Sequence, residues 1–501
     1  MAAAPKLVPL VLTGEERQVL EGWARRRKTA HAMALRSQIV LACAEGASVT
    51  AVAGGLGVSR GTVRKWRSRF LVSRLEGLSD ELRPGAPRKI NNEQAGLVVT
   101  NALDTAAFAA ADRATASSER LEWNETPNSF QLRVVRDERY EILVEKGVTG
   151  DLGRVLVPTI RAMESKSMVI IIDDRVAKHL MDMLGESMCR HGIAFEVLTV
   201  SPGERSKSRR TANRLLDGLR QVGVQRRTLL LAVGGGVICD LVGLVASLYM
   251  RGLPYVNLPT TLMAQVDGAI GGKVAVNHPE AKNLLGAFYH PVQVIIDADL
   301  LGSLPRREVS NGLAEVVKVA VLTDPLLFGL VEGFDLTDVE RLDRDGVDTM
   351  TEVVRRSVAA KLTLLAHDPF ERDLRRVLNF GHSIGHALES STGYRTYRHG
   401  EALSVGLAVA TEISAQEKIC RQDTRDRIID TLRRLALPTV VPDVLIASVW
   451  YHVEVIKRIR NGPLNFVVPA EIGDARILDN ISQSAYLSAL RTLTKEESAC
   501  V

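Results

Sequence analysis

The feature that most constrains the fold is a regular alternation of strand-like and helix-like segments after about residue 130. Apolar runs such as SMVIIIDD and TLLLAVGGG are separated by amphipathic stretches such as VAKHLMDMLGESMCRHG. This alternation predicts a parallel sheet with helices on its faces. From about Pro305 onward strand signals become scarce and long amphipathic helices dominate. We therefore expect an α/β domain followed by an all-α domain.

Composition excludes several classes of protein. The 501 residues are 46% hydrophobic and 25% charged, as in globular proteins. No apolar run reaches the roughly 18 residues of a membrane helix, and the N-terminus lacks the apolar core of a secretory signal. We expect a cytoplasmic protein with no membrane partner. The five cysteines are scattered and odd in number, which argues against disulfides or a cysteine zinc site.

Positive charge is concentrated at the N-terminus. Residues 1–97 hold 16 Lys and Arg against 8 Asp and Glu, whereas the remainder holds 48 against 51. Residues 48–70 are typical of a short helix, a glycine turn and a second helix that Ser59 caps. Such a helix can enter the major groove of DNA. The candidate contacts are Arg60, Thr62, Arg64 and Lys65. A solvated basic helix in an ordinary bundle is the alternative.

Two motifs in the α/β half predict a nucleotide site. The strand LLLAV leads into Gly234, Gly235 and Gly236 before a helix, so a phosphate can approach backbone amides at the helix start. Asp173 ends an earlier strand, where a carboxylate can bind ribose hydroxyls. Because the motif is not GxGxxG, a plain tight turn is the alternative for the glycines.

The segment NFGHSIGHALE is the strongest indication of a metal. Asn379, His382 and His386 fall on one side of a predicted helix, and His399 follows in YRHGEA. With Glu315 from another helix, His382 and His399 would form a zinc site that leaves a position open for substrate oxygens. A histidine buried for structural reasons is the alternative.

Cations near these motifs predict an anionic substrate. Lys273 follows two glycines and Lys282 lies in an apolar segment, contexts that suit phosphate or carboxylate binding better than a solvated surface. The full set is Arg251, Lys273, Lys282, Lys318, Lys361 and Arg375.

Two families share ordered motifs with the chain. Residues 11–97, with GVSRGTVRKWRSRF and RPGAPRKI, resemble the DNA-binding part of mariner-like transposases. Residues 130–500 resemble 3-dehydroquinate synthase and related sugar phosphate cyclases, through PGExxK, GGGVxxD, PTTLxAQVD, GGK, NHPxxKNxxGAF, GLAEVVK, LNFGHxxGHALE and HGEA. We expect a helix-turn-helix region over 1–104, an Ala- and Ser-rich linker over 105–128, an α/β NAD-binding domain over 129–306, and a helical metal and substrate domain over 307–501.

The cyclase resemblance implies roles for individual residues. Zinc, or cobalt, would be held by Glu315, His382 and His399. NAD would contact Asp173, Glu204, Lys207, Gly234, Gly235, Gly236, Asp240, Thr260 and Thr261. The catalytic groups would be Asp267, Lys273, Lys318, Asn379 and His386. The substrate would meet Arg251, Lys282, Asn283, Lys361, Arg375 and Lys457. Lys361 and Arg375 would bind a carboxylate, and Arg251 would reach across a homodimer.

The resemblance also implies the chemistry. NAD would oxidise a ring hydroxyl and later return the hydride, phosphate would be eliminated, and an intramolecular aldol would close a carbocycle. Retention of Asn379 and His386 favours 3-dehydroquinate synthase, because relatives that use sedoheptulose 7-phosphate often lose both. However, HDPFERD and Ile456, Lys457 and Arg458 depart from the housekeeping pattern, and VAVN is similar to the valiolone-forming branch. A 2-epi-valiolone or 2-epi-5-epi-valiolone type synthase is therefore the alternative.

Two other classes are compatible with parts of the sequence. Metal-dependent alcohol and glycerol dehydrogenases share the expected fold, but they lack the cationic cluster and would release NADH. A DNA-binding protein with a degenerate cyclase domain would keep the basic N-terminus, but the intact set of catalytic residues argues against it. We expect residues 1–97 to have no role in catalysis.

Overall fold

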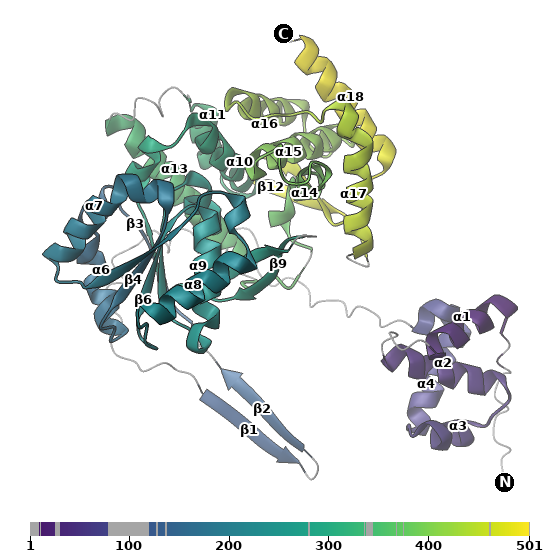
Figure 1. The fold of residues 1–501 in the computed structure, drawn as a ribbon. Coiled ribbons are helices and arrows are strands. Elements are labelled where there is room, and N and C mark those ends of the chain that lie inside the picture. The colour runs from purple at the N-terminus through teal and green to yellow at the C-terminus, as the bar shows by residue number, and fades with distance from the viewer. Residues whose placement is uncertain are drawn as a thin grey trace. The chain divides into compact units, whose positions relative to one another are not determined.

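The computed structural model describes residues 10, 12–25, 31–78, 120–126, 129–135, 138–278, 281–334, 336, 344–366, 368–373, 375–459 and 462–499. The chain divides into two compact units, Met1–Ala110 and Ala111–Val501 (Figure 1). Among the described helices, none combines the length and apolar character needed to cross a bilayer. The basic segment RPGAPRKI and the predicted linker up to residue 119 lie outside the described residues.

The N-terminal unit is a small helical bundle. It comprises α1 (Gly14–Arg25), α2 (His31–Ala44), α3 (Val49–Leu56), α4 (Arg60–Ser73) and a short 3-10 helix, η1 (Arg74–Leu78). Gly57 ends α3 in a left-handed conformation, with φ of 64°, and the Ser59 hydroxyl accepts a hydrogen bond from the Thr62 amide at the start of α4. The helix-turn-helix geometry predicted from these residues is therefore confirmed.

The second unit contains a six-stranded parallel sheet in the order β3-β10-β7-β6-β4-β5. The strands are β3 (Glu141–Val144), β4 (Met168–Asp173), β5 (Phe195–Val200), β6 (Leu229–Gly234), β7 (Tyr255–Pro259) and β10 (Gln293–Ile296). The helices around it are α6 (Leu152–Ala162), α7 (Asp174–Arg190), α8 (Arg209–Gln221) and α9 (Gly236–Leu248) (Figure 1).

Alternate residues of β4 explain the two layers of helices. Val169 and Ile171 belong to a core that includes residues of α8 and α9. Met168, Ile170 and Ile172 belong to a second core that includes residues of α6 and α7. Because successive side chains of a strand point to opposite faces, the sheet is covered on both sides, and β4 is apolar up to its last residue, Asp173. The predicted parallel sheet with helices on its faces is confirmed.

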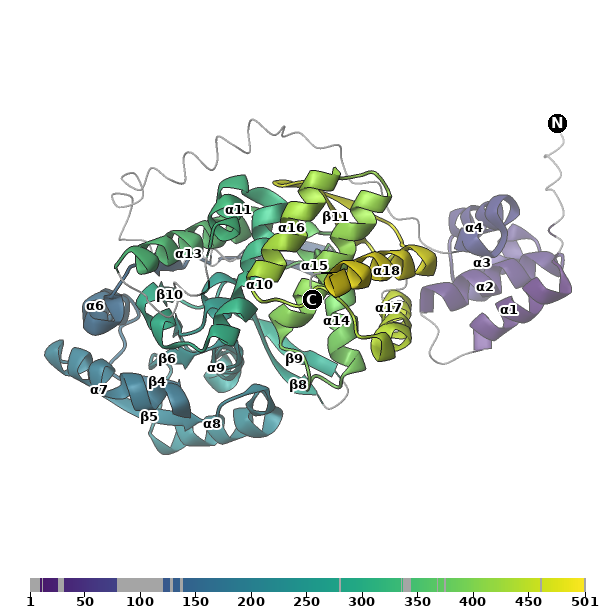
Figure 2. The ribbon, with the colours of Figure 1, turned by 90° about the horizontal axis from the view of Figure 1, so that it is seen from above.

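The remaining helices form a bundle whose core also includes residues of α9 and β10. They are α10 (Arg306–Thr323), α11 (Pro325–Glu332), α13 (Arg344–Leu365), α14 (His382–Ser391), α15 (His399–Gln416), α16 (Gln422–Arg434), α17 (Ile446–Ile459) and α18 (Gln483–Ala499). Helices α10 and α15 are buried along almost their whole length and lie side by side (Figure 2). The helical second half is thus confirmed.

Three antiparallel hairpins were not predicted. They are β1 (Arg120–Thr126) with β2 (Ser129–Val135), β8 (Lys273–His278) with β9 (Ala281–Phe288), and β11 (Phe466–Glu471) with β12 (Asp474–Leu478). The first begins inside the segment interpreted as a linker, and the last lies within the part expected to be all-α. The β8–β9 hairpin extends from the sheet toward α14 (Figure 2), and Lys282 on β9 bonds Glu389 on α14.

Candidate active site

Three helices bring Glu315, His382 and His399 together. They lie on α10, at the start of α14 and at the start of α15, respectively. A Cβ atom on Gly400 would lie 1.9 Å from the Asn311 carbonyl oxygen of α10, so only glycine permits this approach of α15 to α10. This close approach at Gly400 fixes where His399 and Glu315 meet.

The three side chains form a compact group of ligand-type atoms. Glu315 Oε1 lies 3.3 Å from His399 Nε2 and 3.7 Å from His382 Nε2. One ligand atom from each of the three residues lies close enough to the other two for all three to hold one metal ion. In a tetrahedral zinc site with bonds of roughly 2.1 Å, neighbouring ligand atoms are about 3.4 Å apart. The donor set and its spacing therefore fit zinc.

A hydrogen bond on the other ring nitrogen orients His382, and an ion-pair contact orients His399. His382 Nδ1 lies 3.2 Å from the Phe380 carbonyl oxygen, and His399 Nδ1 lies 3.6 Å from Glu389 Oε1. A metal-binding histidine usually donates its second N–H to such a carbonyl or carboxylate, which directs the remaining nitrogen at the ion. Both Nε2 atoms face Glu315 in this way.

The electrostatics of the group also call for a cation. Burial and the charge of Lys318 hold the pKa of His382 well below its ordinary value, so this ring is neutral, as a ligand must be. Burial opposes the charged form of His399, but its bonds with Glu315 and Glu389 raise the pKa to about 10. Burial would raise the pKa of Glu315, whereas the charge of Lys318 lowers it to about 2. Two ionised carboxylates thus enclose His399, and positive charge between them is favoured.

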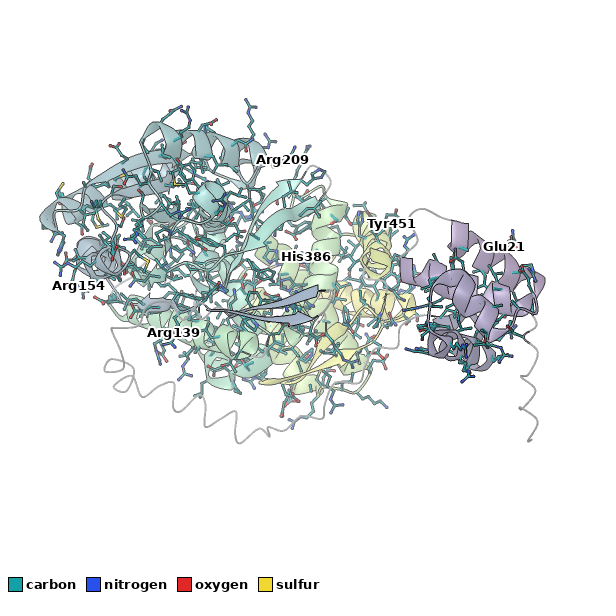
Figure 3. The ribbon with its side chains drawn as sticks, turned by 90° about the horizontal axis from the view of Figure 1, so that it is seen from below. Glu21, Arg139, Arg154, Arg209, His386 and Tyr451 are labelled. Atoms are coloured by element: carbon teal, nitrogen blue, oxygen red, sulfur yellow. The ribbon has the colours of Figure 1, made fainter. Side chains whose placement is uncertain are left out.

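Glu389 is a site residue that sequence reasoning missed. Its side chain is 1% exposed, and it contacts Lys282 Nζ at 2.9 Å and His386 Nδ1 at 3.0 Å, in addition to His399. His386, Glu389 and His399 also satisfy metal spacing. However, the His386 side chain is 48% exposed, and Lys282 already engages a Glu389 oxygen. We therefore favour the Glu315 group as the metal site. His386 is labelled in Figure 3.

Three of the predicted lysines, Lys318, Lys361 and Lys273, are each paired with a carboxylate. Lys318 lies 2.5 Å from Glu315 Oε2, and Lys361 Nζ lies 2.8 Å from Asp267 Oδ1. Lys273 pairs with Glu371, a second residue that sequence reasoning missed, and burial lowers the pKa of Lys273. These pairs hold cations in a partly buried site without leaving bare charge in it.

The loop of Gly234, Gly235 and Gly236 lies near a second cluster of polar side chains. A Cβ on Gly236, the first residue of α9, would meet nothing within 4 Å, so its helix N-terminus is open to a ligand. Lys207 pairs with Asp240 and donates to Asn283 Oδ1 at 2.5 Å. Asn277 donates to Glu204 at 2.7 Å and accepts from the Asn283 amide at 3.0 Å. Asn277 was not predicted, although it lies in the quoted NHPxxKN motif.

The threonines predicted for NAD flank the same loop. The Thr260 amide donates to the Gly234 carbonyl at 3.0 Å, and a Cβ on Gly235 would lie 3.1 Å from the Thr261 methyl. Asp173 instead caps α7, where its carboxylate accepts a hydrogen bond from the Arg175 amide at 2.8 Å.

Three of the predicted substrate residues are exposed or only half-buried in this structure. Arg375 pairs with Asp479 at 3.4 Å with its side chain 58% exposed, Arg251 is exposed, and Lys457 is half-buried on α17. Asn379 was expected on the same helix face as the histidines, but this was wrong. It ends the 3-10 helix η7 (Val377–Asn379), and Gly381 with φ of 76° separates it from α14.

Sequence comparisons agree with this geometry. Residues 197–311 match the 3-dehydroquinate synthase N-terminal family, and residues 312–458 match the 3-dehydroquinate synthase C-terminal family. A 2-epi-valiolone synthase of Stigmatella aurantiaca is 44% identical over 375 residues, which cover 74% of this chain and 92% of the relative. The chain belongs to the 3-dehydroquinate synthase family. It is a sugar phosphate cyclase, and the predicted class of carbocycle-forming lyase is confirmed.

Other members of the 3-dehydroquinate synthase family are also similar. A 3-dehydroquinate synthase of Acaryochloris marina is 36% identical over 357 residues, covering 70% of this chain and 95% of the relative. The solved 2-epi-5-epi-valiolone synthase of Streptomyces hygroscopicus subsp. jinggangensis, with NAD+ and Zn2+ bound, is 31% identical with a TM-score of 0.66. The alignment covers 73% of this chain and 99% of that structure. Residues 31–79 match a homeodomain-like domain, outside the part shared with the cyclases.

Proposed function

We propose that this cyclase forms 2-epi-valiolone, or a closely related cyclitol, from sedoheptulose 7-phosphate with NAD+ and zinc. This reverses the order of the two substrates predicted from the sequence. The 44% identical relative is a 2-epi-valiolone synthase, whereas the 3-dehydroquinate synthase from Acaryochloris marina is 36% identical.

The observation that carries the proposal is the position of the two expected carboxylate partners. Arg375 is exposed and pairs with Asp479, and Lys361 is enclosed by oxygen atoms of the chain itself. A carboxylated heptulosonate would need both cations at its C1 carboxylate. Sedoheptulose 7-phosphate has no carboxylate, so a site without these contacts still suits it.

The proposed roles follow from the pairs already described. Glu315, His382 and His399 would hold zinc, which supplies polarisation of a substrate oxygen when bound. The glycine loop, Asp240 and Lys207 would hold NAD, which supplies a reversible hydride acceptor when bound. Lys273, Lys282 and Lys318 would exchange their carboxylate partners for anionic oxygens of the substrate. Asp267, Asn379 and His386 would position hydroxyls or move protons at them.

The test is phosphate release by the purified protein with catalytic NAD+ and zinc. We expect release from sedoheptulose 7-phosphate and none from 3-deoxy-arabino-heptulosonate 7-phosphate. Release from the heptulosonate alone would overturn the proposal in favour of 3-dehydroquinate synthesis. Stoichiometric NADH formation without phosphate release would instead indicate a dehydrogenase. The same preparation tests the expected homodimer by light scattering.

We separately propose that the N-terminal unit binds DNA through α4. Val63, Trp66 and Phe70 are buried on one side of this helix. The opposite side exposes Arg60, Arg64 and Lys65. No Asp or Glu occurs from residue 46 to residue 75, so the exposed face is purely cationic. A helix of this kind, capped at its N-terminus and basic along one face, suits a DNA groove and its phosphates.

Deletion of residues 1–119 tests this second proposal. We expect the full chain to bind a mixed-sequence DNA duplex with an affinity that falls as salt rises, and the deleted chain to lose this binding while still releasing phosphate. Equal duplex binding by both chains would rule out α4 as the DNA-binding element. Loss of phosphate release by a folded deleted chain would contradict the expectation that the N-terminal unit has no role in catalysis.

A further inference from the structure

The β8–β9 hairpin is irregular where two of the predicted substrate residues lie. After Val276 its register shifts, so that Asn277 alone on β8 stands opposite residues 282–284 of β9. An irregularity of this kind bends a strand and redirects its side chains, and it is common beside active sites. In β9 it contains Lys282 and Asn283. The contacts of Asn277 therefore bear on where both of these side chains point.

Asn283 adopts a backbone conformation that needs support. Its φ is 54°, in the left-handed region, which residues other than glycine adopt rarely, although asparagine tolerates it better than most. Two hydrogen bonds hold it there. The Asn283 amide donates to Asn277 Oδ1 at 3.0 Å, and Asn283 Oδ1 accepts from Lys207 Nζ at 2.5 Å. Unusual conformations of this kind persist only where the surroundings fix them, so Asn283 depends on Asn277 and Lys207.

Asn277 is also bound to the segment expected to contact the cofactor. Its side-chain Nδ2 donates to Glu204 Oε1 at 2.7 Å, and its backbone amide donates to the Lys207 carbonyl at 2.9 Å. Glu204 begins the 3-10 helix η3 (Glu204–Ser206), and Lys207 follows it. Asn277 forms an isolated parallel bridge with Ser208, whose hydroxyl caps α8. Both the backbone and the side chain of Asn277 thus attach β8 to the cofactor segment.

The side-chain amide of Asn277 uses its donor and its acceptor on different partners. It donates to a carboxylate of the cofactor segment and accepts from a backbone amide of the hairpin. Among side chains of this size, an ionised aspartate would offer only acceptors, and a leucine would offer neither a donor nor an acceptor. An aspartate would also place a second negative charge beside Glu204. Asparagine therefore suits a position that joins the two segments.

We propose that Asn277 is a positioning residue that joins the cofactor site to the substrate hairpin. It orients Glu204 toward NAD+ and holds Asn283 in its left-handed conformation, so it acts through these two residues and not on either ligand. The effect on substrate rests on the proposed cyclase function, whereas the effect on NAD+ binding is measurable without substrate.

The experiment compares Asn277→Ala and Asn277→Asp with the parent, using Asn213→Ala on the exposed face of α8 as the matched control. Affinity for NAD+ is measured by calorimetry on zinc-loaded protein, and KM is measured with sedoheptulose 7-phosphate. For Asn277→Ala we expect NAD+ affinity to fall about tenfold, the size of effect expected for a hydrogen bond to a charged group. KM should also rise about tenfold, because the strained conformation of Asn283 loses its support.

The aspartate variant separates the two contacts. Asn277→Asp keeps an acceptor for the Asn283 amide but repels Glu204, so NAD+ affinity should fall at least as far as in Asn277→Ala while KM rises less. Asn213→Ala should match the parent in both quantities.

A double substitution tests whether Asn277 acts through Glu204. Once Glu204→Ala is present, Asn277→Ala should cost little further NAD+ affinity, because the hydrogen bond between the two side chains is already lost. Additive losses would contradict the proposal, and so would parent-like NAD+ affinity and KM in Asn277→Ala. Equal changes in the alanine and aspartate variants, together with a lower melting temperature, would indicate a merely structural role and would also overturn it. Lack of turnover by the parent would refute the proposed function alone, because the NAD+ measurements would still stand.

Discussion

The catalytic unit and the N-terminal unit both carry cations, but they hold them in opposite ways. In the catalytic unit each of five lysines is paired with one carboxylate, as Lys207–Asp240, Lys273–Glu371, Lys282–Glu389, Lys318–Glu315 and Lys361–Asp267. On α4, Arg60, Arg64 and Lys65 have no carboxylate partner among the described residues. Paired, partly buried charges can form a fixed site for a small anion, whereas unpaired exposed charges suit a polyanion and respond to salt.

The largest expected effect comes from breaking the metal group of the catalytic unit. His382→Ala should remove one of three ligands and lower phosphate release about a thousandfold, since polarisation by a bound metal is worth several kcal/mol. Zinc content measured by elemental analysis should fall with it. His179→Ala, on the exposed surface of α7, is the control and should retain both zinc and activity. Full activity of a zinc-free His382→Ala protein would contradict the assignment.

A smaller effect is expected for Glu389, a carboxylate that contacts a metal ligand and not the metal itself. Glu389→Gln keeps the size of the side chain but weakens its contacts with His399, His386 and Lys282. Removal of such a supporting carboxylate typically costs 10–100-fold in metal affinity or activity, and we expect a loss of about that size in both. Glu332→Gln breaks an ion pair with Arg427 elsewhere in the bundle and serves as the matched control. Equal zinc affinity in the two variants would show that Glu389 does not support the metal site.

The fold was predictable where the pattern was long and local. Successive apolar runs defined the parallel sheet, and long amphipathic stretches defined the bundle. The hairpin β11–β12 was not predicted, because its strands are short and the first contains Pro469, which weakens a strand pattern. The prediction that Asn379 shares a helix face with the histidines was wrong. The helical periodicity of the sequence continues through Gly381, but the left-handed conformation of this glycine interrupts the backbone, and a new helix begins after it.

The site was predictable as a set of residue types but not as a set of pairs. Glu315, His382 and His399 could be inferred because two histidines and a carboxylate in recognisable motifs match zinc chemistry. Glu389 lies inside the quoted LNFGHxxGHALE motif, yet its partner Lys282 is 107 residues away in the chain. Likewise, Lys361 appeared as a cation near an anionic substrate, while its acceptors at Asp267 and Ile270 are brought to it only by tertiary packing.

In the N-terminal unit, removal of one exposed cation should have a graded effect. Arg64→Ala in the full chain should weaken duplex binding modestly and reduce the slope of log affinity against log salt by about 0.9 if Arg64 contacts one phosphate. Phosphate release should be unchanged, because the metal and nucleotide groups lie in the other unit. Arg17, which faces Glu45 at 3.7 Å on another part of the bundle, provides the control variant Arg17→Ala. Identical salt slopes for Arg64→Ala and the parent would show that Arg64 does not contact a phosphate.

The smallest expected effect concerns the ion pair in the N-terminal unit that most resembles the catalytic pairs. Arg74 Nε donates to Glu16 Oε1 at 2.8 Å, and this bond lowers the pKa of Glu16 to about 2. Because the folded pKa lies below the usual value of 4.5, the pair stabilises the unit fully above that value and less as pH falls toward 2. The Arg74 side chain is 43% exposed, so solvent screening should limit the gain to about 1 kcal/mol.

Hydrogen exchange of peptides from α1 and α4 in the intact protein, corrected for intrinsic rates at pH 6 and pH 3, would measure this effect. Protection in the parent should fall between the two conditions, whereas Glu16→Gln should begin lower and change less. Glu45→Gln is the matched control, since Glu45 is more exposed and its partner Arg17 lies 3.7 Å away. If Glu16→Gln and the parent lose protection equally at low pH, the pair does not stabilise this unit. The cations of the N-terminal unit would then all differ from the paired lysines of the catalytic unit.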